Sequence, residues 1–144
     1  KRNVPFALLA TLNRADIDFY SLQKGEPAES ELITTHARHW QGDNFHVLTQ
    51  DIDDFTDTAA LIYHLDLVIA VDTSTAHLAG AMAKPVWLLN RFDSCWRWLL
   101  GRDDSPWYPT MHIFKQQQPD DWESVLLRVS EALEHWRRNY DARY

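Results

Sequence analysis

The chain has 144 residues, 45% hydrophobic and 12% aromatic, so it can bury a sizeable core and we expect one domain over residues 1–144. Its formal net charge of −7 argues against a general nucleic-acid binder, which needs a basic face to displace counterions. No apolar run approaches the roughly 20 residues of a membrane span. The one cysteine, Cys95, excludes an internal disulfide and fits a reducing cytoplasm. Because the chain begins at Lys1 rather than Met, we expect a fragment of a longer protein.

Short apolar segments alternate with polar loops along the first half of the chain. We expect helices at Asn3–Asn13 and Thr58–Leu65 and strands at Ile17–Leu22 and Phe45–Thr49. The polar segment Glu29–Trp40 is ambiguous. Asn3 is a candidate cap for the first helix. The acidic run Asp51–Asp57 is expected to be a loop that ends in a helix cap at Asp57.

The second half continues the alternation. We expect strands at Leu67–Val71, Val86–Leu89 and Met111–Phe114, and helices at Thr75–Ala83 and Asp120–Tyr140, with irregular chain at Asn90–Pro109. This order predicts an α/β fold, a Rossmann-like doubly wound parallel sheet with helices on both faces. Ligands of such sheets bind beyond the carboxyl ends of the strands. The corners after Leu22, Thr49, Val71 and Leu89 should therefore share one edge.

The join between the third strand and its helix, Asp72–Thr75, is the most informative stretch. A buried strand changes there to three hydroxyl-bearing residues and then to helical spacing. The first turn of a helix leaves amides unpaired and its dipole favours negative charge, so an anion such as a nucleotide diphosphate can bind there. The alternative is a plain N-cap, but Thr73, Ser74 and Thr75 exceed what one cap requires. Asp72 can instead accept hydrogen bonds from ligand hydroxyls.

Two further polar residues are candidates for contact with phosphate. His77 either donates to phosphate beside the helix start or is a half-buried histidine satisfied by a backbone carbonyl. Lys24 follows the first strand and either touches phosphate or is an ordinary surface lysine. Gly80 costs about 1 kcal/mol against Ala in a helix interior. We therefore expect Gly80 to allow close packing against the sheet or a neighbouring helix.

Other kinds of site find little support in the sequence. With 4 glycines the chain has neither a dinucleotide fingerprint nor a P-loop, and its histidines lack zinc spacing. We therefore expect no metal and no cofactor. Ser74 and Ser94 lack a nucleophile elbow. The tryptophan-rich segment Trp96–Tyr108 either forms a satellite core, stacks on a base or sugar, or packs on a neighbouring domain.

Several segments resemble heptosyltransferase-like glycosyltransferases, above all the form at the C-terminus of bacterial tetratricopeptide-repeat proteins. The resemblance covers nearly the whole chain and is carried by Phe19–Gly25, Asp54–Ile62, Asp72–Ala81, Lys84–Leu89 and Trp96–Pro109. It implies the C-terminal half of a glycosyltransferase B-type fold, which holds the nucleotide-sugar donor. In the relatives an N-terminal domain provides the acceptor site and usually the general base, and the resemblance leads us to expect this domain outside the 144 residues. The implied partners are therefore the donor and an upstream domain or helical repeats.

The resemblance assigns donor binding to Lys24, Asp72, Thr73, Ser74, Thr75 and His77, although relatives commonly have glycine where Ser74 stands. It implies that the chain is the donor-binding half of an inverting glycosyltransferase. Two alternatives stay open, a catalytically inactive binding or scaffold module and the nucleotide-binding half of an unrelated enzyme such as a sugar epimerase. No residue of this chain is assigned as the general base.

Overall fold

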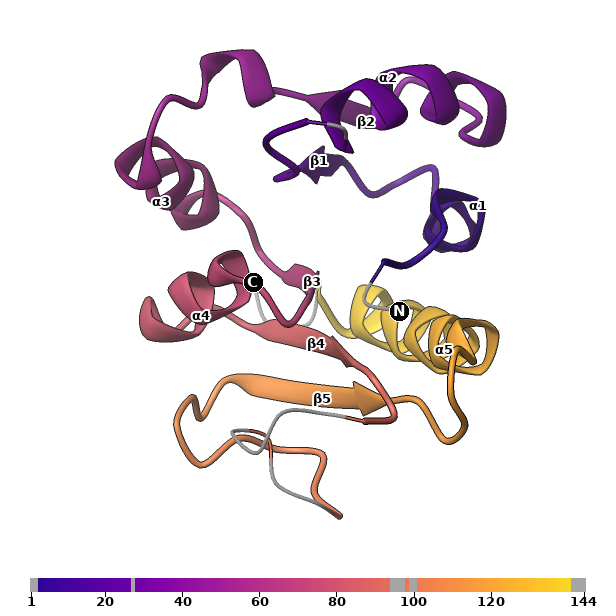
Figure 1. The fold of residues 1–144 in the computed structure, drawn as a ribbon, viewed down its shortest axis with the longest axis vertical. Coiled ribbons are helices and arrows are strands. Elements are labelled where there is room, and N and C mark those ends of the chain that lie inside the picture. The colour runs from indigo at the N-terminus through magenta and orange to yellow at the C-terminus, as the bar shows by residue number, and fades with distance from the viewer. Residues whose placement is uncertain (1–2, 27, 94–97, 99–100, 141–144) are drawn as a thin grey trace.

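The computed structural model describes residues 3–26, 28–93, 98 and 101–140, and strands alternate with helices along it (Figure 1). The helices are α1 (Phe6–Leu9), α2 (Ala28–His39), α3 (Phe55–Tyr63), α4 (Ser74–Ala81) and α5 (Trp122–Tyr140). The strands are β1 (Phe19–Ser21), β2 (Phe45–Val47), β3 (Val68–Val71), β4 (Val86–Asn90) and β5 (Met111–Lys115). Short 3₁₀ helices at Ala10–Leu12 and Thr49–Asp51 follow α1 and β2. The alternation confirms the predicted α/β class.

The strands form two parallel sheets, where the sequence led us to expect one. β1 pairs with β2, and β3, β4 and β5 pair in that order. No ladder joins β1 to β3 within the described residues, and the side chains of Phe19 and Ile69 pack instead onto the core beneath α5. A three-residue strand offers few ladder hydrogen bonds, so side-chain packing holds the smaller sheet against the rest of the molecule.

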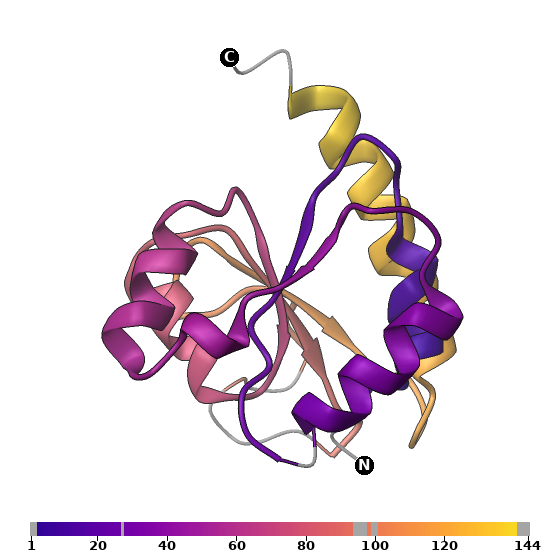
Figure 2. The ribbon, with the colours of Figure 1, turned by 90° about the horizontal axis from the view of Figure 1, so that it is seen from above.

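Helices cover both sides of the strands (Figure 2). α3 and α4 lie on one side, and α1, α2 and α5 lie on the other. Each side has its own apolar core; the first is built from Ile62, Val68, Ala76, Ala79, Val86, Leu88, Trp98, Met111 and Ile113, the second from Leu12, Leu89, Phe114, Trp122, Val125, Leu126, Val129 and Leu133. Two covered faces explain why the strands read as nearly continuous apolar runs. The arrangement confirms the Rossmann-like, doubly wound class. Among the described residues, no helix has the length and hydropathy needed to cross a bilayer.

Some element boundaries differ from those predicted. The segment that the sequence left open is α2, which carries Glu29 and Glu31 in its first turn, where the helix dipole favours negative charge. The cap predicted at Asp57 is wrong, because Asp54 caps α3 and its carboxylate accepts a hydrogen bond from the Asp57 amide. The cap predicted at Asn3 is also wrong, since α1 begins after Pro5 without a side-chain cap.

Candidate functional site

The corner between β3 and α4 presents free amides, as the sequence predicted. Thr73 is the N-cap residue, with extended backbone at φ −140° and ψ 170°, and it makes no capping hydrogen bond through its side chain. Its hydroxyl donates instead to the Val71 carbonyl at 3.3 Å. Within the described residues, the amides of Ser74, Thr75 and Ala76 therefore have no acceptor. These donors, at the positive end of the α4 dipole, can hold an anion.

The hydroxyl groups at the start of α4 extend this set of donors. Ser74 is exposed and Thr75 is half-buried. Neither side chain has a hydrogen-bond partner within the described residues, since the first bonded side chain of α4 there is that of His77. A hydroxyl beside a free amide can donate to the same phosphate oxygen or to a sugar oxygen.

Asp72 and His77 meet at this corner. The His77 Nε2 lies 3.4 Å from Asp72 Oδ1, and the two side chains are 30% and 13% exposed. Nδ1 of His77 lies 3.0 Å from the Tyr108 hydroxyl. The imidazole stacks on Trp98, with ring centroids 5.2 Å apart and an interplanar angle of 25°. Among the described residues, His77 is therefore held by side-chain groups, and not by the backbone carbonyl that the sequence left as an alternative.

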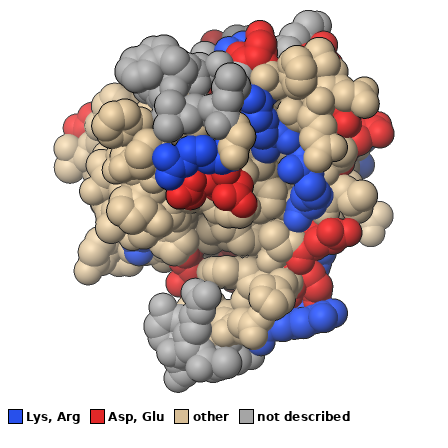
Figure 3. Space-filling model, turned by 90° about the horizontal axis from the view of Figure 1, so that it is seen from below, with Lys and Arg blue, Asp and Glu red and all other residues tan. Residues whose placement is uncertain are grey.

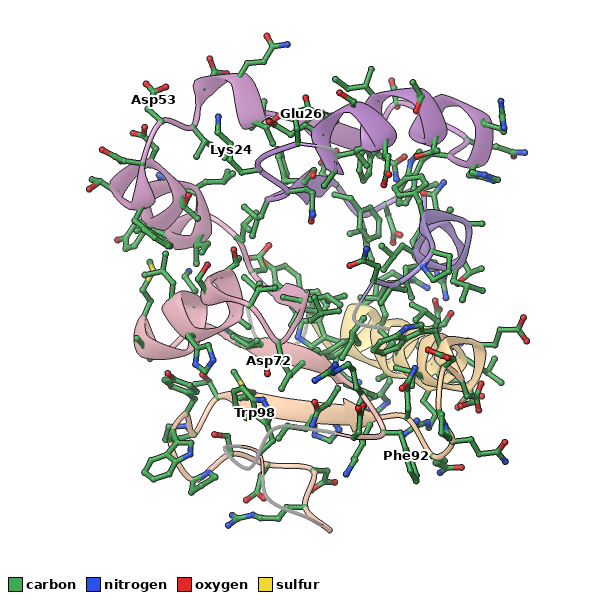
Figure 4. All side chains as sticks on the ribbon, viewed as in Figure 1. Lys24, Glu26, Asp53, Asp72, Phe92 and Trp98 are labelled. Atoms are coloured by element: carbon green, nitrogen blue, oxygen red, sulfur yellow. The ribbon has the colours of Figure 1, made fainter. Side chains whose placement is uncertain are left out.

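Lys24 is separate from the other predicted residues. Its side chain donates through Nζ to the Thr49 carbonyl at 2.8 Å, which joins the corner after β1 to the corner after β2. Figure 4 shows Lys24 in the upper half of the molecule near Asp53, and Asp72 in the lower half near Trp98. Five of the six predicted site residues thus gather at the start of α4, and Lys24 lies apart from them, bonded to Thr49.

The segment before β5 contributes Tyr108, which the sequence did not single out as a site residue. The Ile113 amide donates to the Asp103 carbonyl at 2.7 Å, and Asp104 makes an antiparallel bridge with His112. Two nitrogens of the Arg102 guanidinium donate to the Asp104 carboxylate at 2.7 and 2.8 Å, which lowers the pKa of that carboxyl. These contacts hold the segment along the edge of the sheet.

Gly80 explains how Tyr108 reaches His77. A Cβ on Gly80 would lie 2.7 Å from Cγ of Tyr108, so only glycine leaves room for the ring. The expected close packing at Gly80 is confirmed, although its partner is this irregular segment and not the sheet or a helix. A glycine three residues after His77, on the same side of the helix, was the signal in the sequence that could have located the contact.

The tryptophan-rich segment divides into core and surface. Trp98 is fully buried and joins the core beside α4, which favours the satellite-core interpretation for this residue. Trp107 is 60% exposed. Trp96, with Ser94 and Cys95, lies outside the described residues.

Charged side chains of both signs lie on the surface of the molecule. On the face shown in Figure 3, Lys and Arg side chains lie beside Asp and Glu side chains and do not form one broad basic field. In the part of the chain that the structure describes, no group of three or more His, Cys, Asp or Glu residues could hold a metal ion. The described site therefore offers amides, hydroxyls, one imidazole and one carboxylate, a set suited to phosphate and sugar oxygens.

Comparison with known proteins identifies the family. Residues 7–90 match glycosyltransferase family 9 (heptosyltransferase). The chain is also 34% identical over 125 residues to Protein FlbA of Caulobacter vibrioides, an alignment that covers 85% of this chain and 20% of FlbA. No solved structure matches the chain. The family match spans more than half of the chain and includes β3, the start of α4 and β4, so this protein belongs to glycosyltransferase family 9, the heptosyltransferase family.

Proposed function

We propose that this chain is the donor-binding half of an inverting glycosyltransferase, a single Rossmann-like domain over residues 1–144. The observation that carries the proposal is the start of α4, where three amides lack acceptors within the described residues and Asp72 and His77 lie 3.4 Å apart. Membership of a glycosyltransferase family supports a nucleotide sugar as the ligand. The diphosphate would bind the α4 amides, and the sugar hydroxyls would donate to Asp72.

The chemistry follows from the charge that develops on the leaving group. In an inverting transfer, an acceptor oxygen forms a bond to the anomeric carbon as the bond from that carbon to the diphosphate oxygen breaks. The electron pair of the broken bond stays on the nucleoside diphosphate, and the acceptor proton passes to a general base. Donors already aimed at the leaving oxygen contribute several kcal/mol, on the order of 3, in a site that excludes water. Ser74, Thr75 and His77 would supply that stabilisation.

The rest of the reaction requires groups outside this chain. We propose that an upstream domain provides the acceptor site and the base, and that helical repeats of the tetratricopeptide type precede it in the same protein. The alignment with 20% of FlbA supports this, because a protein of that length has room for both. We also propose that the protein is cytoplasmic, which its single cysteine supports because a reducing compartment does not favour disulfides.

Two substitutions at Ser74 separate the amide from the hydroxyl. Ser74→Pro removes one amide at the first helical position, where proline fits, and the extended backbone of Thr73 tolerates a following proline. Ser74→Ala keeps the amide and removes only the hydroxyl. We expect calorimetric titration with ADP, UDP and GDP to show binding at least about tenfold weaker for Ser74→Pro, as for the loss of one hydrogen bond to a charged group.

Controls and outcomes distinguish this proposal from its alternative. Asp72→Ala and His77→Ala should weaken binding, and Asp53→Ala, an exposed carboxylate far from the site, should not. If none of the site variants changes affinity, the α4 site is wrong. If none of the three nucleotides binds at millimolar concentration to the protein with its upstream domain present, the chain is a glycosyltransferase-like scaffold module without transferase function.

A further inference from the structure

The position of His77 depends on a side chain from a distant part of the chain. Its Nδ1 faces the Tyr108 hydroxyl at 3.0 Å, its Nε2 faces Asp72 at 3.4 Å, and one ring face stacks on the fully buried Trp98. Tyr108 is 31 residues further along the chain. Nδ1 and one face of the imidazole are therefore engaged before any ligand arrives, and Nε2 lies within ion-pair distance of Asp72.

Asp72 favours one tautomer of the imidazole, and the Tyr108 hydroxyl fits it. An ionised carboxylate only accepts hydrogen bonds, so Asp72 favours the proton on Nε2. The Nδ1 of that tautomer is an acceptor, and the Tyr108 hydroxyl can donate to it. With the proton on Nδ1 instead, the unprotonated Nε2 would face the carboxylate oxygen and two acceptors would oppose each other. The contact with Tyr108 is thus compatible with the choice made by Asp72, since the hydroxyl then donates to Nδ1 and fixes the ring.

Tyr108 is itself held in place from three directions. Its amide donates to the buried Ser105 hydroxyl oxygen at 3.2 Å, and its carbonyl accepts from the Met111 amide at 3.0 Å. Its ring lies against Gly80, where a Cβ would come within 2.7 Å of Cγ. The ring also meets the His77 ring edge to face, at a centroid distance of 5.7 Å and an angle of 67°. A side chain anchored in this way can fix the orientation of its neighbour.

We propose that Tyr108 is a positioning residue for the transfer reaction, which holds His77 with its protonated Nε2 toward the start of α4, and that Gly80 provides the space for this contact. The inference rests on the proposed function, since it gives His77 its orientation for contact with the donor diphosphate. Tyr108 acts through His77 and is not assigned any contact with the donor.

Tyr108→Phe tests the hydroxyl alone, because the ring can keep its place on Gly80. The matched control is Tyr63→Phe, which removes a hydroxyl from a ring that is 67% exposed and meets another histidine, His64, at 5.3 Å. Long-range ¹H–¹⁵N spectra of the chain report which imidazole nitrogen carries the proton. We expect one Nε2–H form of His77 in the wild type and in Tyr63→Phe, and a measurable fraction of the Nδ1–H form in Tyr108→Phe.

Nucleotide binding provides the second measurement. For whichever of ADP, UDP and GDP binds most tightly, we expect roughly threefold to tenfold weaker binding by Tyr108→Phe, as for the loss of one hydrogen bond, and no change in Tyr63→Phe. Gly80→Ala keeps the hydroxyl but displaces the ring, so it should reproduce the His77 spectrum of Tyr108→Phe.

The outcomes separate this inference from the proposed function. If Tyr108→Phe leaves the His77 nitrogen signals unchanged, Tyr108 does not position His77, whatever happens to affinity. If those signals change and the wild type binds no nucleotide, the proposed function fails and the role of Tyr108 in orienting His77 stands, without its link to the donor. If the signals change and binding is unaltered, the orientation of His77 does not matter for the donor and the inference is overturned.

Discussion

Glu134 on α5 is hydrogen-bonded by two arginines from opposite ends of the chain. The Arg14 Nε donates to one carboxylate oxygen at 3.1 Å, and Arg137 donates to the other. These hydrogen bonds lower the pKa of Glu134 to about 2 from an ordinary value of 4.5. The bond from Arg137 has the largest effect, and the bond from Arg14 has the next largest. Arg137 also donates to Asp16 at 2.7 Å. The network ties the end of the chain to the loop before β1.

The lowered pKa of Glu134 predicts a dependence of stability on pH. Because the folded pKa lies below the unfolded one, the contribution is fully present above pH 4.5 and is lost as the pH falls through about 2. We expect Glu134→Gln to lower the melting temperature at pH 6, with a difference from wild type that shrinks as the pH falls from 4.5 to 2. Scanning calorimetry across this range measures the difference. Glu131→Gln, at an exposed position on the same helix, is the control. A difference independent of pH would contradict the assignment.

The start of α3 shows, at the scale of one element, why helix boundaries are hard to read from sequence. Asp54 caps the helix, and the Asp57 carboxylate in its first turn accepts from the Asp53 amide at 2.9 Å. The two carboxylates thus satisfy two amides across the start of the helix, in an arrangement close to a capping box except that the second amide belongs to the residue before the N-cap. Either aspartate is a good cap on composition alone. The sequence could not choose between them, because the choice depends on where the chain leaves the preceding 3₁₀ helix.

The cap predicts that alanine substitution of two neighbouring aspartates, Asp53 and Asp54, lowers the stability of the protein by different amounts. Asp54→Ala removes the acceptor for the Asp57 amide and should destabilise the protein by about 1 kcal/mol. Asp53→Ala should have a much smaller effect, because Asp53 contributes its backbone amide to the cap. Urea denaturation of both variants measures the two changes. Equal losses of stability would mean that general charge, and not the cap, accounts for the effect.

At the scale of the whole molecule, Asn44 connects the smaller sheet to its surroundings. It is 8% exposed, and its amide nitrogen donates to Asn13 Oδ1 and to the carbonyls of Arg14 and Ile17 at 2.8 to 2.9 Å. Its side-chain oxygen accepts from Trp40 Nε1 at 2.9 Å. One buried amide thus joins the chain before β1, the end of α2 and the start of β2. These contacts brace the ends of β1 and β2, and no ladder links that sheet to the larger one within the described residues.

Loss of these bonds should therefore affect the two sheets unequally. Asn44→Ala leaves the Trp40 indole without its acceptor and removes one donor from each of the Arg14 and Ile17 carbonyls, and should cost about 2 to 3 kcal/mol. We expect hydrogen exchange followed by mass spectrometry to show faster exchange in β1 and β2 than in the wild type, with β3–β5 less affected. Asn139→Ala, which removes an exposed amide that bonds only to His135 within the described residues, is the control. A uniform increase across both sheets would show that they unfold as one unit.

Much of the fold could be predicted from local patterns. The alternation of strands and helices, the long closing helix and the position of the β3–α4 corner follow from hydrophobic spacing and abrupt changes in residue type. α2 could not be predicted in the same way. It is mostly polar, and packing contributes at its end, where Phe6 and Trp40 lie with ring centroids 6.3 Å apart. The assignment of donor binding to the residues at this corner stays a prediction.

The sequence by itself determined the α/β class and the run of amides and hydroxyls at the start of α4, because propensity, capping and periodicity act over a few neighbouring residues. Only the tertiary structure decided that the strands form two sheets, that Lys24 bonds to Thr49, and that Tyr108 faces His77 across Gly80. Lys24 and Thr49 are 25 positions apart in the sequence, and His77 and Tyr108 are 31 positions apart. They meet only after the elements have packed, so no local pattern records them.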